Sequence, residues 1–416
     1  MHKIVVVTSV VVLLAGAVQA QGIAGKKIEL QAGGQRSVSV PVSLPWDGPA
    51  ELEGVLQVRE NATGEVFPAT LCGGQLIFIP DGAMPKTTHE YTVEVESDPQ
   101  GAHVDRVRIQ QKGQEPVLEV YIEGALFTAY HYSNDNKKPF LWPMNADGGV
   151  SVTRDYPMAP IDIKMAEDHP HHKSVWSAYG DIRLPGGEGV DCWAEGDNSG
   201  FQHSGEVTWG SGDAYGWIRA DNVWQDKDHN PIVREQREYR FYATPPRGRL
   251  FDVAVTFTAE YGEVTFKDTK EGGIVAVRMR PELSYRSAVI TNAAGDEGEA
   301  ACWGKPSPWC DFSGEMPEHG WLGLTVFDSP SNMRHPTSWH VRQYGLMGAN
   351  CFGYSYFNEK DYNKGLIPEN GDFVLNQGES VTFHYRVYVH NGDVKRARVA
   401  DRYADYATPP QVRWLD

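Results

Sequence analysis

Hydrophobic and polar residues alternate with a period of two along much of this chain. Successive side chains of a β-strand point to opposite faces, so this alternation predicts strands with one buried face. Clusters of Gly, Pro, Asp and Asn separate the segments, which are rich in Val, Tyr, Phe and Thr. We therefore predict an all-β protein of sandwich type. The segments are "RSVSVPVSL", "HEYTVEVES", "VDRVRIQQ", "LEVYIEG", "REYRFYAT", "FDVAVTFTAE", "GGIVAVRMRPEL" and "SVTFHYRVYVH".

A helical spacing of apolar residues occurs near the end of the chain, in residues 393–407. Asp393 precedes this segment and can serve as its N-cap. We expect one helix here.

A change in composition near residues 112–116, "KGQEP", predicts a domain boundary. Before it lie short strands with ordinary turns. After it the density of His, Trp, Asp and Arg rises. We predict a small N-terminal β-sandwich over residues 21–112 and a large β-sandwich over residues 116–416 that carries the functional site.

Residues 1–20 have the features of a secretory signal peptide. A basic "MHK" precedes the apolar "IVVVTSVVVLLAGA", and Val18 and Ala20 are small residues ahead of a cut before Gln21. No later stretch approaches the roughly 20 apolar residues of a membrane helix. We expect a soluble periplasmic or secreted protein.

Charge narrows the classes of partner. The 416 residues carry a formal net charge of −17, which disfavours nucleic acid and anionic membranes as partners. The chain has 12 Trp and 19 Tyr, and many lie in Gly- and Pro-rich loops. Most of them are expected to pack in the interior, but loop aromatics at the mouth of a sandwich also suit carbohydrate. We expect a carbohydrate partner.

The five cysteines allow two interpretations in an exported protein. Cys302 and Cys310 close the short loop "CWGKPSPWC", so a disulfide there is one alternative. The odd count leaves at least one thiol unpaired within the chain, and isolated, semi-buried thiols are the interpretation we favour.

The segment "EDHPHHKSVW", residues 167–176, concentrates ionisable side chains. In an extended conformation His169 and His171 would share one face, which suits a divalent metal, and Asp168 and His172 would share the other. Pro170 places the segment in a loop or at a sheet edge. An exposed polar loop is the alternative, but three His beside an Asp favour a functional site. Lys173 and Trp176 are candidate substrate-binding residues, with Asp168.

Two clusters near strand ends provide further candidates. In "FKDTKEGG", Glu271 is a candidate acid or base and Lys270 a candidate substrate ligand, against an ordinary surface ion pair. In "HPTSWHVRQYGL", His340 and Arg342 share a face if the segment is a strand. His340 is a candidate catalytic residue, against a hydrogen-bonded core histidine, and His335 and Arg342 are candidate substrate ligands.

Glu195 lies in the loop "VDCWAEGDNSG" close to an aromatic residue. An apolar ring beside a carboxylate would raise its pKa and give sugar C–H groups a platform. The alternative is a solvated turn residue.

Several long segments, in order, resemble one family of exported bacterial proteins, the PmoA-like or methane oxygenase-like family. They include "PFLWPMNADGGVSVTRDYP", "DHPHHKSVW", "DTKEGGI", "WGKPSPWCDFSG" and "HPTSWHVRQYGL". The likeness covers most of residues 120–406. It implies an exported β-sandwich from polysaccharide-degrading bacteria, and a large domain similar to the galactose-mutarotase-like sandwich. It carries over no catalytic residues.

These observations favour an exported carbohydrate-active enzyme of glycoside hydrolase, lyase or epimerase type. Direct proton transfer and a divalent metal held by His169 and His171 stay open as mechanisms. A metal-dependent oxygenase and a non-catalytic glycan-binding protein are the alternatives. The candidate catalytic residues are His169, His171, His172, Glu195, Glu271 and His340.

Overall fold

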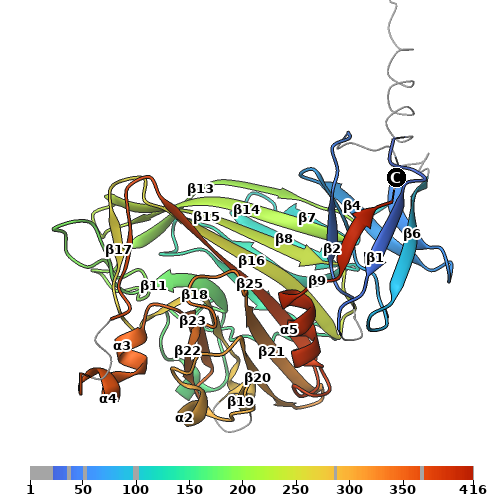
Figure 1. The fold of residues 1–416 in the computed structure, drawn as a ribbon. Helices are drawn as coiled ribbons and strands as arrows, with labels where there is room; N and C mark the ends of the chain where they lie inside the picture. The colour runs from blue at the N-terminus through green and yellow to red at the C-terminus, as the bar shows by residue number, and fades with distance from the viewer. Residues whose placement is uncertain are drawn as a thin grey trace, which may run out of the picture. The chain divides into compact units, whose positions relative to one another are not determined.

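A computed structural model describes residues 22–34, 39–49, 54–96, 103–284, 288–365 and 370–415. The predicted signal peptide lies outside these residues. The chain is built mainly from antiparallel β-sheets, as Figure 1 shows. The prediction of an all-β fold is therefore confirmed. No helix of the described residues has the length and apolar character needed to cross a membrane.

The chain divides into two compact units. Among the described residues, unit 1 contains those up to 106, residues 212–215 and those from 408 on, and unit 2 contains those of 107–211 and 216–407. These bounds differ from the predicted domains of 21–112 and 116–416. One reason is that the last strand pairs with the first, Trp414 lying opposite Ile28. Such a long-range pairing leaves no local signal in the sequence.

Unit 1 holds a seven-stranded sheet in the order β2-β5-β4-β3-β6-β1-β26. Its alternate residues, such as Tyr91 and Val93 of β6, are buried in one apolar cluster. The strands are β1 (Lys27–Gln31), β2 (Val42–Pro45), β3 (Val55–Glu60), β4 (Val66–Cys72), β5 (Gln75–Phe78), β6 (Thr88–Glu96) and β26 (Gln411–Trp414).

Unit 2 contains two eight-stranded sheets. Sheet I has the order β22-β23-β18-β11-β10-β9-β8-β7. Its strands are β7 (Val107–Gln111), β8 (Val117–Ile122), β9 (Ala125–His131), β10 (Phe140–Met144), β11 (Val175–Tyr179), β18 (Gly272–Arg278), β22 (Ser338–Arg342) and β23 (Leu346–Asn350).

Sheet II has the order β13-β14-β15-β16-β25-β21-β20-β19. Its strands are β13 (Phe201–Gly210), β14 (Tyr215–Gln225), β15 (Pro231–Tyr242), β16 (Gly248–Thr258), β19 (Ala288–Asn292), β20 (Trp309–Met316), β21 (Gly320–Asp328) and β25 (Ser380–Asn391). A third, small sheet is formed by β12 (Ile182–Arg183), β17 (Val264–Phe266) and β24 (Phe373–Leu375).

Sheets I and II pack face to face. Phe127 of β9 contacts Phe241 and Phe251 of sheet II, with ring centroids 6.3 and 6.0 Å apart. Side chains of β15 alternate between the two faces of sheet II, so that every second residue packs against sheet I. Unit 2 is thus a β-sandwich.

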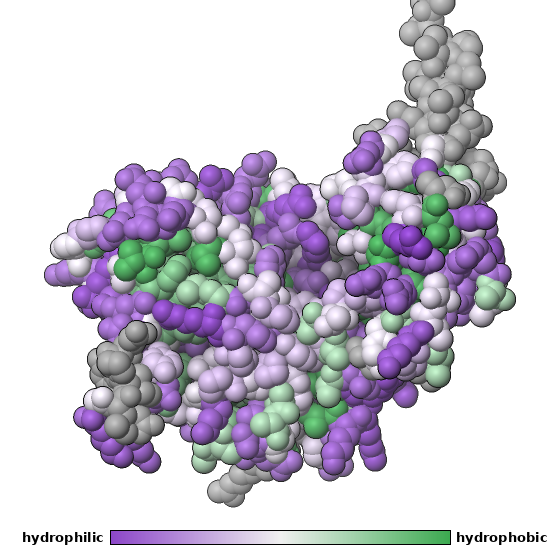
Figure 2. All heavy atoms as spheres, in the orientation of Figure 1, coloured by the Kyte–Doolittle hydropathy of each residue, from purple (hydrophilic) through white to green (hydrophobic). Residues whose placement is uncertain are grey.

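Figure 2 shows that the face of the molecule turned toward the viewer is largely hydrophilic.

Helices are short and few among the described residues. The predicted helix over residues 393–407 begins only at Val399, because residues 394–398 form turns in which Asp393 Oδ1 accepts backbone N–H groups of Lys395 and Arg396. The helical elements are η1 (Lys164–Ala166), η2 (Pro281–Leu283), α2 (Glu299–Cys302), α3 (Tyr354–Phe357), α4 (Glu359–Tyr362) and α5 (Val399–Ala407).

Candidate functional site

The His-rich loop before β11 is a turn. His169 has a left-handed φ of 41°, and the backbone N–H of His172 donates to the His169 carbonyl at 2.9 Å. The predicted extended arrangement, with His169 and His171 on one face, is therefore wrong. The turn instead gathers all three imidazoles on one side of unit 2.

A buried arginine holds this turn in place. Arg154, which is fully buried, donates to the backbone carbonyls of Asp168, His169 and His172 at 2.8 to 3.0 Å. Such a network satisfies the carbonyls of a loop that has no strand partner. The conformation of the loop thus depends on a residue that precedes it by 14 positions or more.

Asp168 is not a free substrate ligand. Its Oδ1 accepts from both Arg154, at 2.7 Å, and Arg278, at 2.5 Å. Burial acts to raise the pKa of this carboxyl, but the charges of Arg278 and Arg154 outweigh it and lower the pKa. The charge of Asp168 therefore organises the loop, and its substrate-binding role stays a prediction.

Four imidazoles and two aromatic rings lie in one packed group, the imidazole cluster. His172 stacks on His169 at 4.8 Å between ring centroids and meets His171 edge-on at 4.3 Å. Trp193 lies 5.4 Å from the His172 ring and 6.2 Å from the His340 ring. The structure thus brings residues from a loop, from β22 and from the Glu195 loop together. The members are His169, His171, His172, Trp193, His340 and Tyr344.

Burial keeps most of these imidazoles neutral. It lowers the pKa of His340 to about 4, against the opposing charge of Glu271. Burial and the charge of Lys138 lower the pKa of His171 to about 4 as well. Burial lowers the pKa of His172 well below its ordinary value. Near neutral pH these three rings are therefore proton acceptors.

Glu271 supplies a carboxylate beside the cluster. Glu271 precedes Gly272, the first residue of β18. A Cβ on Gly272 would lie 2.5 Å from the Tyr179 ring of β11. Only glycine permits this close approach of β18 to β11. Although burial acts to raise the pKa of Glu271, the hydrogen bond from Lys270 lowers it. Glu271 also interacts electrostatically with His171 and His340.

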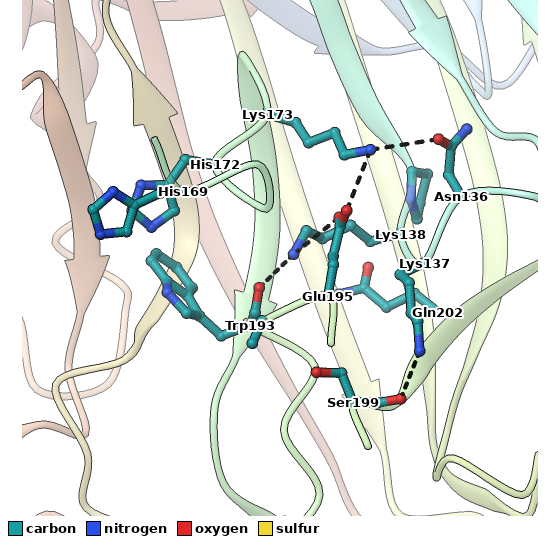
Figure 3. A network of polar contacts seen from close by, with 12 residues as sticks. Asn136, Lys137, Lys138, His169, His172, Lys173, Trp193, Glu195, Ser199 and Gln202 are labelled. Atoms are coloured by element: carbon teal, nitrogen blue, oxygen red, sulfur yellow. Dashed lines mark hydrogen bonds and ion pairs between the residues drawn. The ribbon is translucent and has the colours of Figure 1, made fainter. Parts of the chain in front are cut away.

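A second group, the lysine–glutamate cluster, adjoins the first through Trp193. It consists of Lys138, Lys173 and Glu195, with both ammonium nitrogens 3.4 Å from the Glu195 carboxylate. Lys138 also donates to the Trp193 carbonyl at 2.5 Å. Figure 3 shows Glu195 between the two lysines, with Trp193 turned toward His169 and His172. Glu195 thus faces two cations, and the predicted apolar surroundings are not found.

Three other predicted site residues have structural partners. Trp176 is 1% exposed and packs with Trp193 in the interior, so it offers a sugar no platform. His335 contacts Asp328 at 2.7 Å. Arg342 pairs with Glu299 at 3.1 Å and covers the ring of Trp303, although its charge still acts on His340.

The metal interpretation of His169 and His171 gains no third ligand. Within the part of the chain that the structure describes, one group of three His, Cys, Asp or Glu residues has ligand atoms within 4.8 Å of one another. That group is His103, Asp105 and Asp213 of unit 1, where His103 Nε2 already contacts both carboxylate oxygens of Asp213, at 2.8 and 2.9 Å.

Sequence reasoning named Lys173 and Lys270 but missed three other cations near the imidazoles, Arg154, Arg278 and Lys138. Arg278 ends the apolar run "GGIVAVR" of a buried strand, and a charged residue there was a usable signal. Lys138 lies in the loop "NDNKKPF", where nothing distinguishes it from a solvated lysine. Arg154 and Tyr344 likewise show their roles only in the folded chain.

A separate groove of about 640 Å³ lies on the outer face of sheet II. Several of its charged side chains pair with one another, as Arg219 does with Glu238 and Arg386 with Asp252. None of the predicted site residues lines it. The imidazole cluster, which combines buried bases and excess cations, is therefore the stronger candidate.

Fold and site together define an antiparallel β-sandwich protein with a buried imidazole cluster. The chain belongs to a family of unknown function, DUF6807, whose profile matches residues 117–404. That description names no activity, so the resemblance to PmoA-like proteins stays a prediction. A search of curated proteins finds no match.

Two solved structures show similarity of low degree. Galactose 1-epimerase from Lactobacillus acidophilus NCFM matches with 7% identity and a TM-score of 0.32, over 70% of this chain and 100% of that chain. A galactose mutarotase-like protein from Clostridium acetobutylicum matches with 10% identity and a TM-score of 0.30, over 69% and 98%. The fold class predicted from the sequence was likewise a galactose-mutarotase-like β-sandwich. Similarity this low says nothing about the residues of the site.

Proposed function

We propose that this protein is an exported carbohydrate-active enzyme that abstracts a proton from a sugar, in a reaction of epimerase or lyase type. The observation that carries the proposal is the imidazole cluster. Burial lowers the pKa of His171 and His340 to about 4, and a half-buried carboxylate, Glu271, interacts with both. Buried groups with shifted pKa values are frequent at catalytic sites.

The side chains fit the two needs of proton abstraction. A base must take the proton, and Glu271, His171 and His340 are unprotonated near neutral pH. A cation must stabilise the oxyanion that forms, and Lys270, which pairs with Glu271, is at hand. His340 Nδ1 is buried and has no hydrogen-bond partner among the described residues.

The proposed step breaks a C–H bond adjacent to a carbonyl or carboxylate group. The base receives the proton, and the electron pair moves to the oxygen as an enolate. An epimerase returns a proton to the opposite face of the carbon. A lyase instead forms a C=C bond while the bond from the next carbon to its oxygen substituent breaks, and the departing oxygen takes a proton from the protonated base or from water. Neither outcome requires an oxidant or a reductant.

A glycoside hydrolase is supported less well. Hydrolysis needs a carboxylic acid whose raised pKa keeps a proton for the leaving group. The pKa of Glu271 is lowered, and so are those of His171 and His340. Those shifts favour bases over acids.

The experiment is solvent exchange in D₂O. The purified protein is incubated with a panel of monosaccharides and oligosaccharides, and proton NMR records loss of a C–H signal, a new epimer or an alkene proton. Glu271→Gln should reduce the rate about 10²–10⁴-fold, as expected for loss of a catalytic base. His319→Ala, at an exposed histidine, is the matched control.

Binding of glycans without exchange or conversion would favour a non-catalytic binding protein. Normal turnover in Glu271→Gln would remove this carboxylate from the mechanism.

A further inference from the structure

The two clusters carry an excess of positive charge. Five cationic side chains surround the imidazoles, but only three carboxylates accompany them. Asp168 is shared between Arg154 and Arg278, and Glu195 between two lysines. Glu271 alone has a single cationic partner, Lys270. The cations are Arg154, Arg278, Lys138, Lys173 and Lys270, and the carboxylates are Asp168, Glu195 and Glu271.

This local excess opposes the composition of the chain. The protein has 55 acidic and 38 basic residues, so an average part of it is negative. The field acts on the imidazoles themselves, because Lys138 and Arg278 add to the effect of burial in lowering the pKa of His171 and of His172, respectively. Arg342 leaves the balance unchanged, since Glu299 pairs with it.

Burial decides which cations a ligand can reach. The side chains of Arg154, Arg278 and Lys138 are 0% exposed, whereas those of Lys173 and Lys270 are 9% and 36% exposed. Lys270 already has a hydrogen bond of 2.5 Å to Glu271.

Lys173 has the longest polar contacts of the five cations, and its ammonium also lies 5.0 Å from the ring centroid of Phe140. Among the described residues its ammonium has Glu195 at 3.4 Å and Asn136 at 3.5 Å as oxygen partners. Charge-assisted hydrogen bonds are normally about 2.7–2.9 Å long. The three N–H donors of Lys173 are therefore poorly satisfied, and an anionic group of a ligand would be a better acceptor.

We propose that the site recognises a sugar with an anionic substituent, either a uronate carboxylate or a sulfate ester, and that Lys173 contacts this group. The inference rests on the proposed function and deepens it, because it names the substrate class. Uronates also suit proton abstraction, since a carboxylate acidifies the adjacent C–H bond once cations neutralise its charge.

The test measures the binding of galacturonate, galactose 6-sulfate and galactose to the full mature chain. Calorimetry or ligand-observed NMR gives the three affinities. At low salt we expect an anionic sugar to bind at least tenfold more tightly than galactose. This preference should shrink when salt rises from about 20 to 500 mM, because salt screens charge. The salt series needs no variant and is independent of any folding defect.

Lys173→Met removes the charge and keeps the length of the side chain. It should weaken binding of the anionic sugar about 10- to 100-fold, as expected for loss of a hydrogen bond to a charged group, and change galactose binding less than about twofold. Lys305→Met, at an exposed lysine of the same unit, is the control.

The outcomes separate the two proposals. Preference for galacturonate or for galactose 6-sulfate supports the inference, and the comparison identifies which anion is recognised. Equal binding of galactose and both anionic sugars, or turnover of neutral sugars alone, overturns the inference and leaves the proposed function standing. If no sugar of either kind is bound or converted, the proposed function fails, and the inference fails with it.

Discussion

Histidines occupy two contrasting environments in unit 2. His390 of β25 contacts Asp311 at 2.8 Å, and His335, in the loop after β21, contacts Asp328 at 2.7 Å. We call these two the His–Asp pairs. In the imidazole cluster, by contrast, His171 and His340 have aromatic and cationic neighbours, and burial lowers their pKa to about 4.

The difference concerns what each imidazole can still do. A ring whose nitrogen is engaged by a buried carboxylate is fixed, and its removal leaves an unpaired charge in the interior. A neutral ring packed on other rings has a lowered proton affinity, and no carboxylate holds it in place. Histidines of one chain can thus be divided into structural and candidate catalytic ones by their partners, although the sequence presents them alike.

The largest expected effect of this contrast is on activity. His171→Ala should lower turnover of the true sugar substrate about 10²–10⁴-fold, as should His169→Ala, because the cluster loses a base or its geometry. Neither should unfold the protein. Turnover by NMR and thermal melts are measured together, with His319→Ala as control. Full turnover in both variants would show that the loop is not part of the site, and unfolding of both would make these histidines structural.

The His–Asp pairs should behave in the opposite way. Asp311 and His390 are both 0% exposed, and Asp311 also accepts from Thr325 at 2.7 Å. Asp311→Ala should therefore lower the free energy of unfolding by about 3–5 kcal/mol, because a buried pair loses one partner. Urea denaturation measures this, and Asp228→Ala, at an exposed carboxylate, should change it by less than about 0.5 kcal/mol. A stability loss as small as that of the control would make this pair energetically unimportant.

The same contrast explains how far the sequence could predict the structure. Strand alternation is local, so segments such as "FDVAVTFTAE" identified β16 and its neighbours directly. The turn at His169 depends on Arg154, and the pairing of Trp414 with Ile28 spans almost the whole chain. Neither of these long-range contacts produces a periodic pattern of hydrophobic residues in the sequence. The candidate histidines, Lys173 and Lys270 were found from local sequence clusters, but the roles of Arg154, Arg278 and Lys138 became visible only in three dimensions.

A smaller effect should appear in the pH dependence of stability. The pKa of His340 is about 4 in the folded protein and 6.5 ordinarily. Between those values the unfolded chain binds the proton more readily, so the free energy of unfolding should fall as pH drops from about 6.5 toward 4. One such group contributes up to about 1.4 kcal/mol for each pH unit.

His340→Gln tests this slope. Urea denaturation at several pH values between about 4.5 and 7 should give a shallower pH dependence for the variant than for the unmodified protein. The comparison isolates one group, because the carboxylates that also titrate at low pH are present in both proteins. Equal slopes would mean that His340 is protonated as easily in the folded as in the unfolded chain, and the contrast with the His–Asp pairs would weaken.

The smallest expected effect concerns the thiols of Cys302 and Cys310, of which Cys310 precedes Asp311 in β20. All five cysteines are free, so the structure does not contain the disulfide that was considered for Cys302 and Cys310. Burial raises the pKa of Cys302 to about 11, and that of Cys310 well above its ordinary value. Because the thiolate is the reactive form, iodoacetamide at about pH 8 should leave both unmodified in the native protein and alkylate them after unfolding. A reducing agent should then not change the melting temperature. A mass lower by two hydrogens in the peptides that contain them would reveal a bond and contradict the free-thiol arrangement next to β20.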